Sequence, residues 1–149
     1  MEPDRRDARI LRELVADGRL SNVELAARIG LSPSACLRRV QALERSGVIA
    51  GYRAVIDPAA GGVGLVAYLA VGLDDHTKAA QLAFERGVAD VPEVRECHNV
   101  TGVVEYLLRV EVADIAAYKR FHADVLGSLP QVRSITTYVV MESPKDERG

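Results

Sequence analysis

The chain has 149 residues, which is enough for one ordinary domain or for two small ones, each with its own core. Its net charge of −2 gives no sign of nucleic-acid binding over the whole chain, and its two cysteines are too few for a disulfide framework or a zinc knuckle. It has no basic-then-apolar leader and no apolar run of membrane-spanning length, which predicts a soluble cytoplasmic protein without a membrane partner.

Charge is divided unevenly along the chain. Residues 1–56 carry ten arginines and seven acidic residues, a balance of +3, whereas residues 57–149 carry nine basic and fourteen acidic residues, a balance of −5. A small excess of surface charge is usually only a solvated face. An arginine-bearing part joined to an acidic part nevertheless suggests two modules with different partners.

Three helices are predicted in a first domain that spans residues 1–50. The first covers residues 4–17, and the second begins at a capping box (a serine followed three residues later by a glutamate) and ends at Gly30. The third runs from Ser32, a helix cap followed by proline, to about Ser46. The expected inward faces are Ile10, Leu11, Leu14 and Val15, then Leu25, Ala26 and Ile29, and then Cys36, Val40 and Leu43.

The outward side of the third helix carries arginines and no acidic residue. On most helices such a stripe is only the solvent-exposed side, with no binding role. Here it follows the tight corner of a helix-turn-helix, and small hydroxyl residues at the helix start let the backbone approach phosphates. Arginine reaches phosphate oxygens or the O6 and N7 atoms of guanine. The predicted DNA-binding residues are Ser32, Ser34, Leu37, Arg38, Arg39, Gln41 and Arg45.

Residues 51–63 are predicted as a linker that contains a short strand, "GYRAVID", followed by a Gly61-Gly62 pair. Residues 64–149 then alternate between strand and helix patterns in the order βαββαβ, which is the ferredoxin-like arrangement, so the fold class is α+β. One sheet face is left without helices and carries apolar residues such as Leu107, which predicts that another copy of the chain covers it. The expected strands are residues 65–73, 94–101, 106–112 and 132–141, and the expected helices are residues 77–90 and a segment capped by Asp114.

Two stretches, together with this element order, resemble the Lrp/AsnC (feast/famine) family of transcriptional regulators. They are "DGRLSNVELAARIGLSPSACLRRVQALERSGVIAGYRAVIDP" and "VPEVRECHNVTGVVEYLLRV". The resemblance implies a helix-turn-helix domain that binds double-stranded DNA, joined to a ferredoxin-like domain for effector binding and oligomerisation. It also implies dimers, often assembled as an octamer (a tetramer of dimers), and an amino acid or related metabolite bound between effector domains.

The family's effector loop has a pattern close to T-G-x-x-D-Y, and the matching loop here is Thr101–Tyr106. Its glycine suits a tight turn whose free N–H groups can meet a carboxylate, and Glu105 stands where the family usually has aspartate. Two valines replace a pair that is commonly polar, which favours an apolar effector side chain or no ligand. The other interpretation is a simple hairpin corner. The predicted effector-binding residues are Thr101, Gly102, Val103, Val104, Glu105 and Tyr106, with Thr136 and Thr137 added by analogy.

No other chemistry is indicated. The three histidines are scattered, and Cys97 and His98 are adjacent on a predicted strand, so their side chains point to opposite faces, which is a poor start for a metal site. An enzyme would need convergent titratable groups, and no catalytic residue, metal site or cofactor is predicted. The sequence thus predicts a sequence-specific DNA-binding regulator of amino-acid or related metabolism, with a possible amino-acid effector. The alternative is an effector-independent architectural DNA-binding protein.

Overall fold

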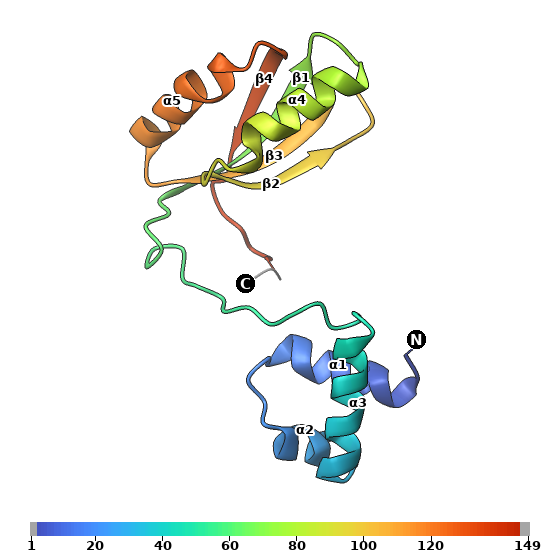
Figure 1. Cartoon of the computed structure of the whole chain (residues 1–149). Coiled ribbons are helices and arrows are strands. Elements are labelled where there is room, and N and C mark those ends of the chain that lie inside the picture. The colour runs from blue at the N-terminus through green and yellow to red at the C-terminus, as the bar shows by residue number, and fades with distance from the viewer. Residues whose placement is uncertain (1–2, 147–149) are drawn as a thin grey trace. The chain divides into compact units, whose positions relative to one another are not determined.

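The computed structural model describes residues 3–146, which form two compact units divided between Ala54 and Val55 (Figure 1). The division falls within the segment predicted as a linker, and each unit has its own hydrophobic core. In the part of the chain that the structure describes, no helix combines the length and apolar character that a membrane crossing requires.

The first unit consists of α1 (Arg5–Ala16), α2 (Asn22–Ile29) and α3 (Pro33–Arg45), which confirms the three predicted helices. The caps lie where the sequence places them: Ser21 and Glu24 form the capping box of α2, Gly30 ends that helix with a φ of 72°, and the Ser32 side chain accepts the N–H of Ala35. These caps satisfy backbone groups that have no partner within the helix, so they set the helix ends locally. The core of the unit consists of Ile10, Leu25, Ala26, Ile29, Cys36 and Leu43.

One predicted inward residue of the first unit faces solvent. The side chain of Val15 is 88% exposed, whereas Ile10 is fully buried. Five residues separate the two, which is about 140° around an α-helix, so both cannot face the same core. The apolar face of α1 is therefore narrower than the sequence predicts.

The predicted strand in residues 51–63 is wrong for the single chain. Residues 51–57 belong to no helix, strand or turn, and Tyr52, Val55 and Ile56 are each more than half exposed. A strand needs a neighbouring strand to exchange backbone hydrogen bonds, and among residues 3–146 of the single chain no strand pairs with this segment.

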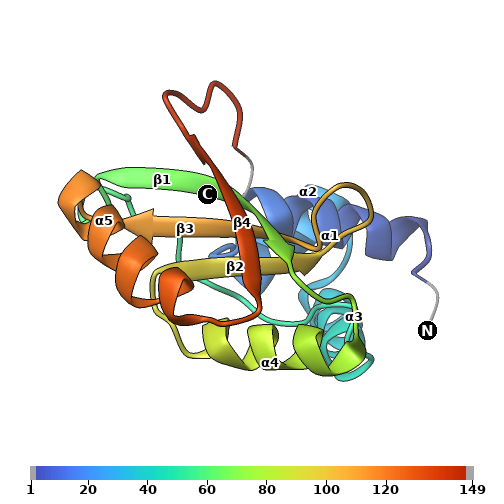
Figure 2. The same ribbon diagram turned by 90° about the horizontal axis from the view of Figure 1, so that it is seen from above.

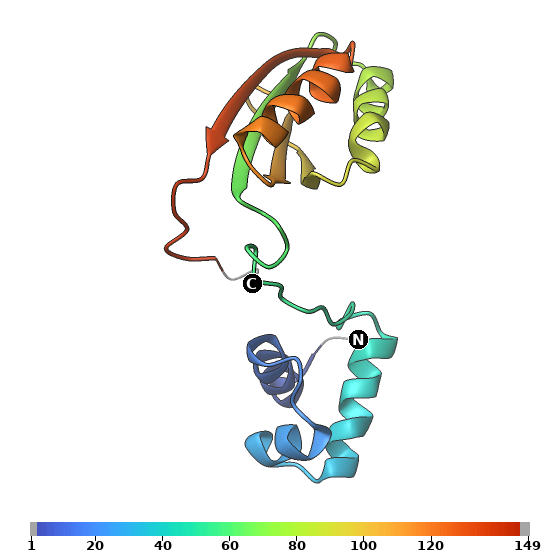
Figure 3. The same ribbon diagram turned by 90° about the vertical axis from the view of Figure 1, so that its left-hand side faces the viewer.

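The second unit has the order β1 (Leu65–Leu73), α4 (Lys78–Ala89), β2 (Val94–Asn99), β3 (Tyr106–Val112), α5 (Ile115–Asp124), a short 3-10 turn (Leu126–Ser128) and β4 (Val132–Val139). The strands form one antiparallel sheet in the order β2-β3-β1-β4. Figures 2 and 3 show α4 and α5 on the same side of this sheet. The arrangement confirms the predicted ferredoxin-like fold and leaves one sheet face without helices.

Alternation along β3 separates the two faces of the sheet. Tyr106, Leu108 and Val110 are buried towards the helices, whereas Leu107, between them, is 40% exposed on the other side. Leu107 pairs with Ala70 of β1, and Ala70 pairs in turn with Thr136 of β4. These three residues lie on the helix-free side, which we call the open face.

Candidate DNA-binding helix and effector loop

The exposed side of α3 gathers six of the seven residues predicted to bind DNA. Among the described residues, Arg38 and Arg45 form no ion pair, so both guanidinium groups are available to an anion. The one acidic residue of the helix, Glu44, accepts a hydrogen bond from the Tyr52 hydroxyl at 3.0 Å. The exposed residues of the set are Ser32, Ser34, Leu37, Arg38, Gln41 and Arg45.

The seventh residue, Arg39, has a different position. Its Nη1 lies 2.8 Å from Oδ1 of Asp7 and 2.9 Å from Oδ2 of Asp4, the residue that caps α1. The hydrogen bond that Arg39 donates to the Asp7 carboxylate is the main reason that the pKa of Arg39 is raised above its ordinary value. Arg39 therefore holds α3 against the start of α1, and we leave it out of the proposed DNA surface.

The corner between α2 and α3 depends on a residue that sequence reasoning missed. The Nδ2 of Asn22 donates to the carbonyl oxygen of Pro33 at 2.7 Å, which ties the first residue of α2 to the first residue of α3. This bond joins residues eleven positions apart, so no helical periodicity could have indicated it. The position of Asn22 directly after the predicted cap was the only available signal.

In the second unit, the predicted effector loop connects β2 to β3. Thr101, Gly102 and Val103 are exposed, and Val103 is 94% exposed. The φ of Gly102 is +131°, in the region that favours glycine, so the turn requires this residue type. Among the described residues, the amides of Gly102, Val103 and Val104 make no backbone hydrogen bond.

Glu105 is already engaged within the unit. Its Oε2 accepts the N–H of Leu73 at 2.7 Å, and its Oε1 lies 2.8 Å from Nδ1 of His76. The side chain is only 11% exposed, and the hydrogen bond from Leu73 is the main reason that the pKa of Glu105 is lowered. The carboxylate therefore joins the loop to the end of β1 and is not free for a ligand in this conformation.

The structure does not support ligand contact by Tyr106. This residue begins β3 on the helix side of the sheet, is 1% exposed, and packs against Phe84 with ring centroids 4.6 Å apart. Its hydroxyl donates to Oε1 of Glu85 at 2.7 Å. Burial, reinforced by Glu85, raises the pKa of Tyr106 to about 12. Tyr106 is a core residue with a satisfied hydroxyl, and the loop that precedes it carries the exposed part of the motif.

Thr136 and Thr137 cannot line one site together, because neighbouring residues of a strand point to opposite faces. The Thr137 hydroxyl is hydrogen-bonded to the Tyr118 hydroxyl of α5, on the helix side. Thr136 pairs with Ala70 on the open face. Only Thr136 is therefore placed where a second copy of the chain could meet it.

No metal centre is evident in the described residues. No group of three or more histidine, cysteine or acidic side chains lies close enough together to hold an ion. The two cysteines are both free, with Cys36 buried in the first unit and Cys97 exposed in the second.

A helix-turn-helix unit with exposed arginines, joined to a ferredoxin-like unit, has the architecture of a DNA-binding transcriptional regulator. Comparison with protein families agrees: residues 3–50 match a winged helix-turn-helix DNA-binding family, and residues 66–149 match the Lrp/AsnC ligand binding domain. The chain belongs to the Lrp/AsnC family of DNA-binding transcriptional regulators.

Individual relatives cover nearly the whole chain. The leucine-responsive regulatory proteins of Escherichia coli K12 and Salmonella typhimurium are 43% identical over 142 residues, which is 95% of this chain and 87% of theirs. A transcriptional regulator from Neisseria meningitidis, solved with L-methionine, has a TM-score of 0.93 at 36% identity and covers 97% of this chain and 94% of its own. A feast or famine regulatory protein from M. tuberculosis, complexed with L-methionine, has a TM-score of 0.85 at 34% identity, with 98% and 97% covered.

Proposed function

We propose that this regulator reads a specific double-stranded DNA sequence through α3 and that a small amino-acid-like effector modulates it. The observation that carries the DNA-binding proposal is the exposed Arg38, unpaired among the described residues, in the middle of a helix whose one acidic residue, Glu44, is engaged by Tyr52. The protein is expected to act in the cytoplasm on genes of amino-acid or related metabolism and to catalyse no reaction. The family to which the chain belongs supports this role.

Replacing either free arginine of α3 tests the DNA surface. Arg38→Ala should weaken binding to the preferred sequence by about 1–3 kcal/mol, roughly fivefold to more than a hundredfold, because a guanidinium that reads a base edge contributes that much discrimination. Arg45→Ala, in the last turn, should weaken binding to all sequences alike. The slope of the logarithm of the binding constant against the logarithm of the salt concentration should become shallower by about 0.9, the value for one phosphate contact. Anisotropy titrations with selected and scrambled duplexes measure both effects.

The matched control is Arg12→Ala, an exposed arginine on α1 that forms no ion pair among the described residues. It should leave the preference between the two duplexes unchanged. Wild-type affinity in both α3 variants would remove this helix from the interface.

We propose that the effector binds at the loop Thr101–Glu105. Two relatives were solved with L-methionine, and the loop here offers backbone amides that have no backbone partner among residues 3–146, beside two apolar side chains. A carboxylate suits such amides, and an apolar side chain suits Val103 and Val104. Because Glu105 is bound to Leu73 and His76, we assign it the role of holding the loop in shape.

Gly102→Glu should abolish the effector response and leave DNA binding intact, because it places a negative charge beside the proposed carboxylate site. Calorimetry with L-methionine and a panel of other amino acids measures the response, and DNA titration is run in parallel. Gly102→Ala is the control, since it imposes the same backbone strain at φ +131° without a charge and should retain part of the response.

If the wild type gives no heat with any amino acid, the loop is only a hairpin corner. The engaged carboxylate of Glu105 and the two valines are the observations that favour this alternative, an effector-independent architectural DNA-binding protein.

We also propose that the open face joins two copies of the chain. One helix-turn-helix contacts a single half-site, whereas a two-fold dimer reads two half-sites about one helical turn apart or a multiple of it. On this face or at its edge, Leu107 is 40% exposed and Tyr138 is 60% exposed. Two sheets stacked face to face would bury both side chains. Further contacts between dimers around the effector loops would build an octamer, a tetramer of dimers.

A further inference from the structure

Leu37 differs in chemistry from the rest of the proposed DNA surface. The other exposed members of that surface are polar, whereas Leu37 is an aliphatic side chain that is 45% exposed. Among the described residues of α3, no other large apolar side chain is exposed, and Leu43 is fully buried in the core. The helix face that we propose to read DNA therefore presents one apolar group among hydrogen-bonding ones.

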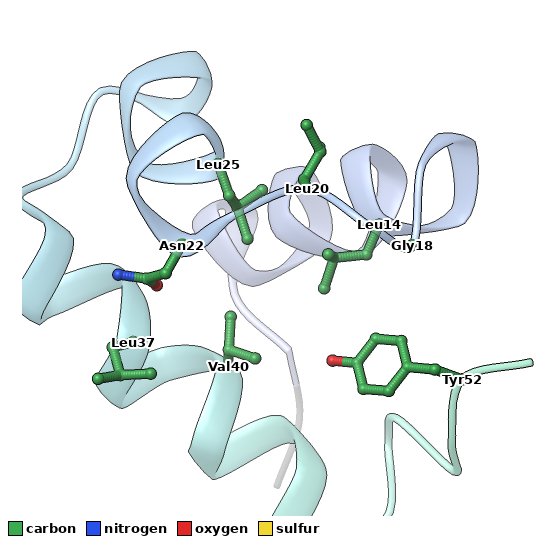
Figure 4. A pocket seen from close by; sticks show the side chains of 8 residues that line it. All are labelled: Leu14, Gly18, Leu20, Asn22, Leu25, Leu37, Val40 and Tyr52. Carbon is green, nitrogen blue, oxygen red and sulfur yellow. The ribbon is translucent and has the colours of Figure 1, made fainter.

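A groove between α2 and α3 supports one side of Leu37. Val40 of α3 and Asn22 of α2 line the same groove (Figure 4). The Asn22 amide donates to the carbonyl oxygen of Pro33 at 2.7 Å, so the two helices are tied together about one turn before Leu37. A side chain that is packed on one side loses less conformational entropy when a partner covers its exposed part.

Leu37 lies beside two long polar side chains of the same helix face. Gln41 is about 40° around the helix from Leu37 and about 60° from Arg38, so it stands between them. In a helix-turn-helix, residues towards the start of the second helix contact base edges in the major groove. The stretch from Leu37 to Gln41 covers about 6 Å of helix, less than two base-pair steps of about 3.4 Å. The three side chains therefore face about three consecutive base pairs.

The major groove offers a single kind of apolar group to such a helix. Guanine, adenine and cytosine present hydrogen-bond donors and acceptors there, and only thymine adds a methyl group, at C5. An aliphatic side chain against one of the other bases removes water from a donor or acceptor without replacing the hydrogen bond. Against thymine, the same side chain buries the methyl group. Isolated exposed leucines are common on protein surfaces, but this one lies where a base edge has to be met.

We propose that Leu37 reads the C5-methyl group of a thymine and so helps to set the sequence that the regulator prefers. The inference rests on the proposed DNA binding by α3 and adds the identity of one base. Gln41, its neighbour on the helix, carries the amide that pairs with N6 and N7 of adenine, so a T·A pair offers a group to each of them. The preferred half-site holds this pair within about three base pairs of the base that Arg38 contacts.

Uracil tests the methyl group alone, because it differs from thymine only by the missing C5-methyl. The preferred duplex is first selected with the full-length protein, and each of its thymines is then replaced by uracil in turn. At one position of a half-site, uracil should weaken binding of the wild type about fourfold, the value for one buried methyl group. For Leu37→Ala, the same replacement should change binding by less than about twofold.

Two further variants complete the comparison. Leu37→Asn has a similar branched shape that ends in polar groups, so it should also lose the discrimination between thymine and uracil. Val15→Ala, at an 88% exposed position of α1, is the matched control and should keep the wild-type ratio. Measuring every variant on the same two duplexes cancels any effect of uracil on the DNA itself.

Three results would overturn the proposal. The first is that uracil has no effect at any thymine, and the second is that it weakens the wild type and Leu37→Ala equally, which would assign the preference to DNA shape. The third is that the wild type binds all duplexes alike and Arg38→Ala has no effect, in which case the proposed DNA reading by α3 fails as well. If Arg38→Ala loses specificity but no thymine distinguishes Leu37→Ala from the wild type, only the thymine contact is wrong.

Discussion

Leu107→Asp is expected to convert the assembled protein into monomers and, because a monomer contacts a single half-site, to reduce its affinity for DNA. Leu107 lies on the open face, opposite Ala70 of β1 and His98 of β2, and a two-fold axis would bring its partner's copy to the same interface. A carboxylate at this position would be buried without a counter-ion twice in each dimer. At about 2 kcal/mol for each copy, the dissociation constant of the dimer should rise about a thousandfold.

Light scattering and sedimentation at micromolar concentration measure the assembly. The control is Val15→Asp, which adds the same charge at a position on α1 that is 88% exposed and should leave the assembly unchanged. A stable monomer in the wild type, or a variant that assembles like the wild type, would rule out the open face as the dimer contact.

Arg39→Met is expected to lower the free energy of unfolding of the first unit by about 2 kcal/mol. The change keeps the aliphatic stem but removes the cation 2.8 Å from Asp7, whose side chain is only 7% exposed. Loss of one partner of a fully buried pair costs about 3–5 kcal/mol, and the expected value is smaller because Arg39 is 29% exposed. Denaturant unfolding followed by circular dichroism measures the change.

The neighbouring Arg38→Met is the control, because its side chain is exposed and unpaired among the described residues, and it should change stability by less than about 0.5 kcal/mol. Adding Asp7→Asn to Arg39→Met should restore part of the loss, since it removes the uncompensated buried charge. Equal stability of Arg39→Met and the wild type would show that the ion pair contributes nothing.

The other carboxylate that Arg39 contacts, Asp4, predicts a pH dependence. The pKa of Asp4 is lowered below its ordinary value of 3.8, mainly by the hydrogen bond from the Asp7 backbone and further by Arg39. A lowered carboxyl pKa stabilises the folded state above the unfolded pKa, and this stabilisation is lost as the pH falls through the native value. The difference between wild type and Arg39→Met should therefore shrink below about pH 3.8.

The helices of the first unit could be derived from the sequence because their signals are local. The serine caps, the proline at the first turn of α3 and the glycine after α2 each satisfy or release backbone groups within a few residues. The alternation of β3 was equally local, and it identified the face that carries Leu107. The order of elements was then sufficient for the ferredoxin-like fold.

The tertiary structure alone decided what the polar side chains do. Arg39 looks like its neighbour Arg38 in the sequence, yet its partners lie 32 and 35 residues away, in the first turn of α1 and at its cap. Glu105 looks like a ligand contact until its bonds to Leu73 and His76 are seen. Periodicity reports which side of a helix or strand a residue occupies, because that depends on backbone geometry repeated along a few residues. It does not report which distant group a charge will meet, because that depends on how the finished elements pack.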